Sequence, residues 1–261
     1  MILYDHPLSS YAQKVKIALR EKGVAFEAVL PKDFGTGQQG TALTTANPRG
    51  EIPVLLLDDE TAIFDSTVIL EFIEERWPAP SLLPKDPVAR AAARMTEEVC
   101  DAQYEAVNWG FGELLWFRRA EGALAERLRA AAARDTAALQ AWLSARLGAA
   151  DWFGGEEFGW ADAAAAPMVN RSVHYGMGPE GGTPLARWHA RLSDRPSVAE
   201  TFAEFDRAAE RMAAASDHYR TGGRRREYRD HRLEWMIRSG GLEVVTAGLR
   251  DDNIRFSWPG V

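Results

Sequence analysis

Two adjacent serines, Ser9 and Ser10, stand before a segment whose apolar residues recur at helical spacing. The first turn of a helix offers unpaired backbone N–H groups and the positive end of the helix dipole, which together favour an anion. A serine hydroxyl adds one more donor, and such groups lower the pKa of a thiol from its free value of ~8.5. The pair therefore suits a thiolate. Simple capping of the helix is the alternative.

The dipeptide Ile52-Pro53 precedes an apolar run and can open a strand. A cis bond at this place would turn the backbone N–H and C=O of Ile52 outward. Those two groups could then pair with an extended, peptide-like ligand, as one strand pairs with another. An ordinary turn is the alternative, since few X–Pro bonds are cis.

A third feature is Asp65-Ser66, which follows one expected strand and opens an expected helix. Ser66 could offer its N–H and hydroxyl to a carboxylate, because the helix N-terminus supports that charge. Asp65 could accept hydrogen bonds from an ammonium group. The pair suits an amino-acid-like group, which carries both charges, although capping alone would also explain it.

The elements that position these residues follow from the apolar pattern. Short apolar or alternating runs predict strands, and spacings of three and four predict helices. The expected strands are 1–4, 25–30, 54–57 and 62–64, and the expected helices of this part are 11–22 and 67–76. The polar, Gly-rich stretch 31–48 is expected to be a loop, with or without a short helix.

The rest of the chain is expected to be helical, after a proline-rich break that cannot continue a helix. The expected division is a first domain at 1–78, a linker at 79–87, an all-helical domain at 88–215 and a C-terminal extension at 216–261. Helices are expected at 88–117 (one or two), 124–147, 159–173, 185–192 and 198–214.

The composition excludes several classes of protein. The chain has 261 residues, a formal net charge of −7 and one cysteine, Cys100. The negative charge argues against general nucleic-acid binding, and a single cysteine allows no disulfide within the chain. The N-terminus does not resemble a signal peptide, and no run supplies the ~20 apolar residues of a membrane span. We expect a cytoplasmic protein with no membrane partner, and the five histidines show no metal spacing.

In this order the three features resemble the cytosolic glutathione transferase superfamily over roughly residues 1 to 215. The matching pieces are "SSYAQKVKIALREKG", "NPRGEIPVLLLDD", "FDSTVILEFIEERWP", "FGWADAAAAPMVNR" and "RWHARLSDRPSV". The resemblance implies an α+β two-domain fold, with a thioredoxin-like βαβ-ββα domain followed by a helical bundle. The start of the chain looks most like the serine- and cysteine-type enzymes of the zeta and omega classes. The helical part and tail look more like the bacterial β-etherases and glutathione lyases.

The resemblance also implies roles for individual residues. Ser9, six residues before Val15, would donate to the glutathione sulfur, and Ser10 would be a second donor or the helix cap. Ile52 would pair by its backbone with the cysteinyl part of glutathione, next to a cis-proline at Pro53. Asp65 and Ser66 would hold the γ-glutamyl end. Candidates for the glycyl carboxylate are Lys32, Gln38 and Gln39.

The pocket for an electrophile is expected to be lined from the helical domain and from Tyr11. The spacing of Tyr104, Asn108, Phe111 and Leu115 places these four on one helix face, although core packing is the alternative for most of them. His174 and Tyr175 are further candidates, and a lone histidine is more often structural.

Two departures from the family pattern stand out. The reactive position holds serine, so a mixed disulfide between glutathione and the protein is not expected. Gly159 replaces the usual hydroxyl residue at a helix cap, which leaves Asp162 to bond back to the cap N–H.

The Arg-rich tail "RRREYRDHR" is either a solvated helix face, a segment closing over the active site or an arm around a partner subunit. Trp235, Phe256 and Trp258 suggest that the end of the chain is docked.

The sequence therefore favours a homodimeric glutathione transferase of the detoxifying kind. It would activate glutathione as a thiolate for attack on an aromatic or unsaturated small electrophile. Conjugation, ether or thioether cleavage, dehalogenation and isomerisation remain open. The alternative is a non-catalytic binding or regulatory protein with the same fold.

Overall fold

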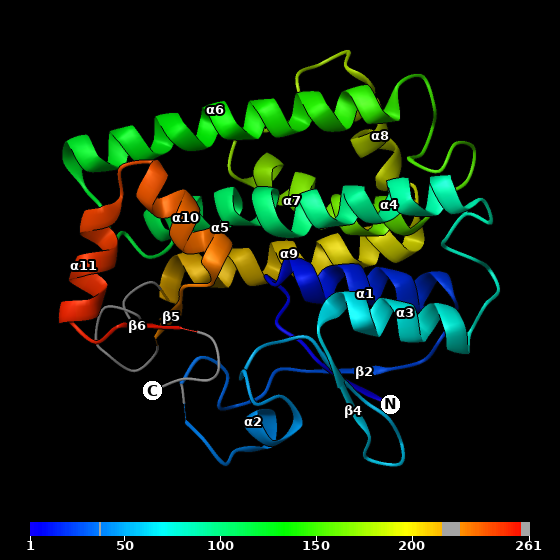
Figure 1. Ribbon diagram of the computed structural model, residues 1–261, viewed down its shortest axis with the longest axis horizontal. Coiled ribbons are helices and arrows are strands. Elements are labelled where there is room, and N and C mark those ends of the chain that lie inside the picture. Colours follow the sequence, from blue (N-terminus) through cyan, green and yellow to red (C-terminus); the bar gives the residue numbers. More distant parts are fainter. Residues whose placement is uncertain (37, 216–224, 257–261) are drawn as a thin grey trace.

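The first domain of the computed structural model is a four-stranded mixed sheet with helices on both faces (Figure 1). The structure describes residues 1–36, 38–215 and 225–256. The elements are β1 Ile2–Tyr4, α1 Ser10–Glu21, β2 Glu27–Val29, α2 Ala42–Ala46, β3 Val54–Leu56, β4 Ala62–Phe64 and α3 Ser66–Arg76. This is the expected order of elements, and α2 is a short helix within the expected loop.

The sheet has the order β2-β1-β3-β4, with β1 parallel to β2 and the other neighbours antiparallel. Leu3 of β1 lies opposite Leu55 of β3, and both are fully buried against α1 and α3. Figure 1 shows α1 and α3 between the sheet and the other helices, whereas α2 lies on the far side. The thioredoxin-like domain is thereby confirmed.

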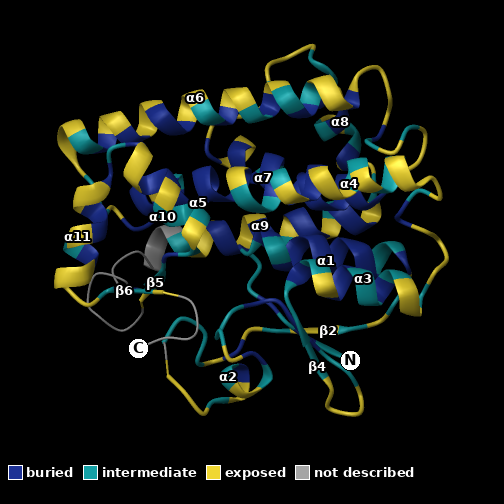
Figure 2. Ribbon diagram, viewed as in Figure 1, coloured by how far each residue is buried: buried dark blue, intermediate teal, exposed yellow. Residues whose placement is uncertain are grey.

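The second domain is all-helical, as expected. Its helices are α4 Pro87–Val99, α5 Glu105–Leu115, α6 Gly122–Leu147, α7 Trp160–His174, α8 Pro184–Leu192 and α9 Pro196–Ala215. A π-helical turn, Cys100–Tyr104, joins α4 to α5, so the expected segment 88–117 is one helical run with an irregular turn inside it. Figure 2 shows that α7 is buried along most of its length.

Two lysines of α1, Lys14 and Lys16, are fully buried where α1 meets the helical domain. The Lys14 ammonium lies 2.6 Å from a Glu97 oxygen of α4. The Lys16 ammonium lies 2.9 Å from Asp5 and 2.7 Å from Glu204 of α9. Because an unpaired buried charge is very unfavourable, these pairs fix how α1 sits on the helical domain.

The start of α7 shows why glycine stands at its cap. The Gly159 N–H donates to an Asp162 oxygen at 2.9 Å, as the sequence predicted. A Cβ on Gly159 would lie 2.7 Å from the Leu82 carbonyl oxygen, which accepts the Trp160 N–H. The usual hydroxyl residue therefore does not fit here.

The C-terminal extension packs against α5. It comprises β5 Arg226–Glu227, α10 Asp230–Arg238, α11 Leu242–Arg250 and β6 Ile254–Arg255. Trp235 is 1% exposed and lies over Gly110, where an added Cβ would come within 2.2 Å of the indole. Docking is thus confirmed for Trp235. Phe256 is instead 46% exposed, and Trp258 lies outside the described residues.

Among the described helices, none has the length and apolar character needed to cross a membrane. The described residues likewise contain no cluster of three His, Cys, Asp or Glu side chains able to hold a metal ion.

Candidate functional site

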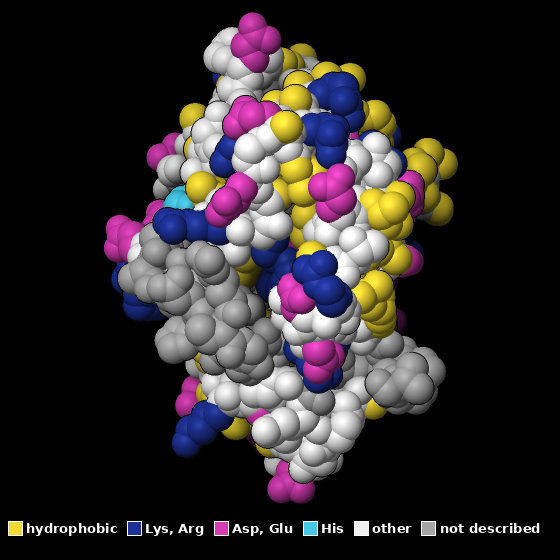
Figure 3. Space-filling model, turned by 90° about the vertical axis from the view of Figure 1, so that its left-hand side faces the viewer, with side chains coloured by type: hydrophobic (Ala, Val, Ile, Leu, Met, Phe, Trp, Pro, Cys, Tyr) yellow, Lys and Arg dark blue, Asp and Glu magenta, His cyan; other side chains and the backbone are white. Residues whose placement is uncertain are grey.

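Two adjoining cavities lie where the sheet domain, α5 and the extension meet. The first, called here the arginine cavity, has a volume of about 150 Å³ and is lined by Arg171, Arg225, Arg226, Arg229, Arg232 and Arg255. The second, the acidic cavity, has a volume of about 430 Å³ and is lined by Glu51, Asp65, Glu97, Glu98, Asp101 and Asp230. Tyr11, Glu51, Ile52 and Arg229 line both, so the two cavities adjoin each other. Figure 3 shows basic side chains in a hollow near the middle of one face.

Ser9 and Ser10 both line the arginine cavity, at the N-terminus of α1. Ser9 is the helix cap, because its Oγ accepts the Ala12 N–H at 3.3 Å. The Ser9 hydroxyl proton remains available to a ligand. Ser10 is 2% exposed, and its Oγ has no hydrogen-bond partner among the described residues. Of the two roles foreseen for Ser10, the cap therefore falls to Ser9.

Ile52 and Pro53 line the acidic cavity, and the bond between them is cis. Among the described residues, neither the N–H nor the C=O of Ile52 has a hydrogen-bond partner, because β3 begins only at Val54. The backbone of Ile52 is thus open to an extended ligand, as the sequence predicted.

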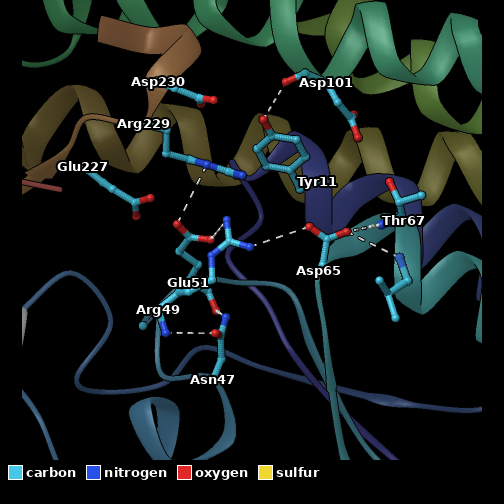
Figure 4. Close-up of polar contacts among 12 residues, drawn as sticks. Tyr11, Asn47, Arg49, Glu51, Asp65, Thr67, Asp101, Glu227, Arg229 and Asp230 are labelled. Carbon is cyan, nitrogen blue, oxygen red and sulfur yellow. Dashed lines mark hydrogen bonds and ion pairs between the residues drawn. The ribbon is translucent and has the colours of Figure 1, made fainter. Parts of the chain in front are cut away.

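Asp65 and Ser66 stand at the start of α3 and also line the acidic cavity. One Asp65 oxygen accepts the Thr67 N–H at 3.0 Å, and the other lies 3.9 Å from the Arg49 guanidinium (Figure 4). Asp65 has a φ of 71°, a left-handed backbone conformation that is uncommon outside glycine. Such local strain recurs at functional sites, where the surrounding structure holds it in place.

The loop candidates for the glycyl carboxylate do not reach either cavity. Lys32, Gln38 and Gln39 are all exposed to solvent. Phe34 and Gly35 of the same loop line the arginine cavity instead, and the Gly35 carbonyl accepts the Arg225 N–H at 3.1 Å. The extension thus meets this loop through its backbone.

Of the expected pocket residues, Tyr11 lies at the site and the four from the helical domain line neither cavity. Tyr104 and Asn108 are fully buried in the core, where they bond Gln140 and the Met168 carbonyl. Leu115 is 47% exposed, and Phe111 packs on Tyr175.

A different face of α5 lines the arginine cavity. Trp109 and Gly112 of α5, together with Trp116 just after it, line the arginine cavity, and so does Tyr175. Both faces carry aromatic residues at helical spacing, so the pattern alone could not say which one faces the site. His174 is not among the lining residues and packs on Phe205 instead.

The extension covers the site through Arg229, which the sequence did not single out. Its guanidinium lies 3.9 Å from a Glu51 oxygen and 5.7 Å from the centre of the Tyr11 ring (Figure 4). Tyr11 in turn donates its hydroxyl to the Asp101 carbonyl at 2.7 Å. In the sequence, only the Arg-dense composition of the tail indicated that an arginine of this segment could contact the site. Described residues of the tail thus line both cavities, which favours closure over the site among the three alternatives.

Glu105 of α5 anchors this cover. It is 3% exposed and accepts bonds from Arg232 at 2.7 Å and from His231 at 2.9 Å. Burial alone would raise its pKa, but Arg232 and His231 hold the pKa of Glu105 well below its usual range. Burial, with Glu51 alongside, raises the pKa of Glu227 to about 7.

Family comparisons agree with this geometry. Residues 8–76 match the model "Glutathione S-transferase, N-terminal domain", and residues 122–191 match "Glutathione S-transferase, C-terminal domain". The extension lies beyond both matched ranges.

Individual relatives extend over most of the chain. The probable glutathione S-transferase parC of Nicotiana tabacum is 32% identical over 77% of this chain and 88% of its own length. Glutathione S-transferase GstB of Escherichia coli K12 is 31% identical over 75% and 94%. A glutathione S-transferase from Methylobacterium radiotolerans, solved in complex with glutathione sulfonate, superposes with a TM-score of 0.64 at 33% identity, covering 77% and 93%. The chain therefore belongs to the glutathione S-transferase family.

Proposed function

We propose that this protein is a serine-type glutathione transferase that binds glutathione across the acidic cavity and directs its thiolate at an electrophile in the arginine cavity. One observation carries the proposal. Ser9 lines the arginine cavity, Asp65 lines the acidic cavity and Ile52 lines both, which is the order in which the sulfur, the γ-glutamyl end and the cysteinyl backbone between them would need these residues.

The γ-glutamyl group has an ammonium and an α-carboxylate, and the residues at the start of α3 could bind both charges. The acidic cavity has six carboxylate residues against two arginines, Arg94 and Arg229, so it favours an ammonium group. Asp65 would accept from that ammonium, and Ser66 at the helix N-terminus would hold the α-carboxylate. The Ile52 backbone would pair with the cysteinyl residue.

The sulfur would then lie at the N-terminus of α1. Ser9 can accept the cap bond from Ala12 and donate its own proton to the sulfur at the same time. The unpartnered Ser10 hydroxyl would be a second donor. A protein thiol plays no part in this scheme, because Cys100 is buried and burial raises the pKa of its thiol.

For the glycyl carboxylate we assign the cations nearest the loop after β2. Arg225 bonds Gly35 through its backbone, and the Arg255 guanidinium bonds the Arg49 and Gly50 carbonyls at 3.2 and 3.3 Å. Both arginines line the arginine cavity, whereas Lys32 and Gln39 do not. The glycyl end would therefore rest under the extension.

The named relatives support this proposal, since they are glutathione S-transferases and one was solved with glutathione sulfonate. The serine-type subgroup, the division at residues 78, 87 and 215, a homodimer and a cytoplasmic location are parts of the same proposal. Sedimentation that detects only monomer would count against the dimer.

Glutathione binding tests the proposal directly. A ligand at a hundred times its dissociation constant stabilises a protein by about 2.7 kcal/mol, so millimolar glutathione should raise the melting temperature. Oxidised glutathione and free cysteine at the same concentration serve as comparisons. No thermal shift, together with no retention on a glutathione matrix, would instead favour the non-catalytic binding protein.

A further inference from the structure

Arg171 of α7 is a buried cation in the wall of the arginine cavity. It is 8% exposed and donates from Nη2 to the Leu8 carbonyl at 2.6 Å. Its guanidinium also lies 5.2 Å from the centre of the Trp116 ring. No carboxylate lies within ion-pair distance of it among the described residues. A buried charge without a partner has an unfavourable desolvation free energy, so an anionic ligand that pairs with Arg171 would bind favourably.

The other arginines of the cavity are already paired with acids. Arg232 pairs with Glu105, Arg226 with Glu113, Arg225 with Asp252, Arg255 with Glu227, and Arg229 lies 3.9 Å from Glu51. Arg171 therefore differs from its five neighbours in this respect.

Several other polar atoms on lining residues also lack a partner. Among the described residues, the buried atoms with no hydrogen-bond partner include Ser10 Oγ, Arg171 Nε, Tyr175 Oη and Arg255 Nε. All four can donate, and the two arginine nitrogens can only donate. Buried donors are rarely left unpaired in proteins. The proposed function assigns Ser10 and Arg255 to glutathione, which leaves Arg171 Nε and Tyr175 Oη for a second ligand. A ligand with acceptor atoms would satisfy these two donors, whereas a hydrocarbon ligand would not.

The walls also include flat aromatic surfaces. Trp109, Trp116, Phe117 and Tyr175 line the same cavity. They would suit the body of an aromatic ligand, as aromatic walls do in other small-molecule sites.

We propose that the electrophile of this enzyme is an aromatic carboxylate, and that Arg171 is the residue that binds its carboxylate. This inference rests on the proposed function. Leu8, which accepts the Arg171 bond, immediately precedes Ser9, so Arg171 is held near the residue that is proposed to face the sulfur. The glycyl carboxylate of glutathione is the rival anion, but the proposed function assigns it to Arg225 and Arg255 of the extension, whereas Arg171 comes from α7.

A pair of probe electrophiles separates these possibilities. Glutathione attacks the chlorine-bearing ring carbon of 4-chloro-3-nitrobenzoate: a C–S bond forms, the C–Cl bond breaks, chloride leaves and the thiol proton passes to solvent. The methyl ester undergoes the same reaction without the negative charge. Each enzymatic kcat/KM is divided by the uncatalysed rate with glutathione, which removes the difference in intrinsic reactivity.

We expect the wild type to prefer the acid to the ester after this correction. A hydrogen-bonded charge pair supports a discrimination of about ten- to a hundredfold. Arg171→Gln should abolish the preference, and Arg171→Lys should keep part of it. Arg187→Gln is the matched control, because Arg187 is exposed on α8 and lines neither cavity. A wild type that prefers the ester overturns the inference, as does an Arg171→Gln variant that keeps the acid preference.

Two further measurements keep the outcome decisive. If Arg171→Gln does not fold, calorimetry on the wild type compares unreactive 4-nitrobenzoate with its methyl ester, and equal affinities refute the inference. If Arg171→Gln weakens glutathione binding while the acid-to-ester ratio is unchanged, Arg171 serves glutathione instead. If glutathione itself fails to bind the wild type, the proposed function fails, and the same calorimetry still decides whether the cavity selects an aromatic acid.

Discussion

The two cavities adjoin each other, yet their charges are opposed. The acidic cavity has six carboxylate residues and two arginines, and the arginine cavity has six arginines and three glutamates, Glu51, Glu105 and Glu227. Tyr11 and Arg229 stand between them. The difference separates two tasks, because an acidic wall favours the ammonium of a γ-glutamyl group and a basic wall favours an anion.

The two cavities also differ in which part of the chain supplies them. Ile52, Pro53, Asp65 and Ser66 of the acidic cavity lie within residues 8–76, which match the family model. Five of the six arginines of the arginine cavity lie between 225 and 255, beyond both matched ranges. The residues proposed for the γ-glutamyl and cysteinyl parts of glutathione thus lie within a matched range, whereas most arginines of the arginine cavity lie beyond both matched ranges.

Glu105→Gln should have the largest effect, because Glu105 holds both His231 of the acidic cavity and Arg232 of the arginine cavity. Removing one partner of a buried ion pair typically costs 3–5 kcal/mol, so we expect a loss of about 3 kcal/mol in the free energy of unfolding. Denaturant unfolding measures it. The matched control is Glu126→Gln, whose pair with Arg129 is exposed and should contribute less than ~1 kcal/mol. Equal losses in both variants would mean that Glu105 does not anchor the extension.

Ser9→Ala should have the second largest effect, and this effect should fall on the rate of the chemical step. Removing one donor to a developing anion lowers kcat by about 10²–10³, while glutathione should still bind. Loss of the helix cap costs about 1 kcal/mol of stability as well, so thermal unfolding is measured alongside the ultraviolet absorbance of the thiolate. Ser10→Ala, which leaves the cap intact, should have the smaller effect. Unchanged absorbance and turnover in Ser9→Ala would move the sulfur's partner to Ser10 or Tyr11.

Asp65→Asn should affect only the acidic cavity. Asparagine keeps an acceptor for the Thr67 N–H and tolerates a positive φ, so the start of α3 should persist. We expect the dissociation constant of glutathione to rise about ten- to a hundredfold. A glutathione analogue without the α-amino group should bind wild type and variant alike. If both ligands weaken by the same factor, Asp65 does not face the ammonium.

The sheet domain and the positions of Ile52-Pro53 and Asp65-Ser66 within it were predictable because their signals are local, whereas the other acidic residues of the acidic cavity were not foreseen. Residues 62–64 were predicted as a strand and form β4, and the features at Ile52 and Asp65 depend on near neighbours in sequence. Each of these positions follows from proline, a cap or an apolar alternation, which constrain the backbone wherever they occur.

The arginine cavity was not predictable, because it depends on contacts distant in sequence. The packing of the tail on α5 requires the space that Gly110 leaves for Trp235, and no local sequence pattern indicates that fit. The pocket face of α5 was missed because two faces of this helix carry aromatic residues at helical spacing. Arg171 lies in an alanine-rich helix, where its sequence neighbours give no sign of the cavity.

Glu227→Gln should have the smallest effect and should sharpen the contrast between the cavities, because Glu227 is an acid in the basic one. Its pKa in the folded protein is raised from 4.5 to about 7 by burial and by Glu51. The folded state therefore binds more protons than the unfolded state between these values, and the free energy of unfolding falls as the pH rises from about 4.5 to about 7. Below this window both states are protonated, so the stabilisation is complete there. Glutamine does not titrate, so the variant should gain stability relative to wild type as the pH rises across the window. Denaturant unfolding at both ends of the window measures the gain, and Glu243→Gln, an exposed change on α11, is the control. A pH-independent difference between wild type and Glu227→Gln would show that Glu227 is ionised throughout, with Arg255 neutralising it.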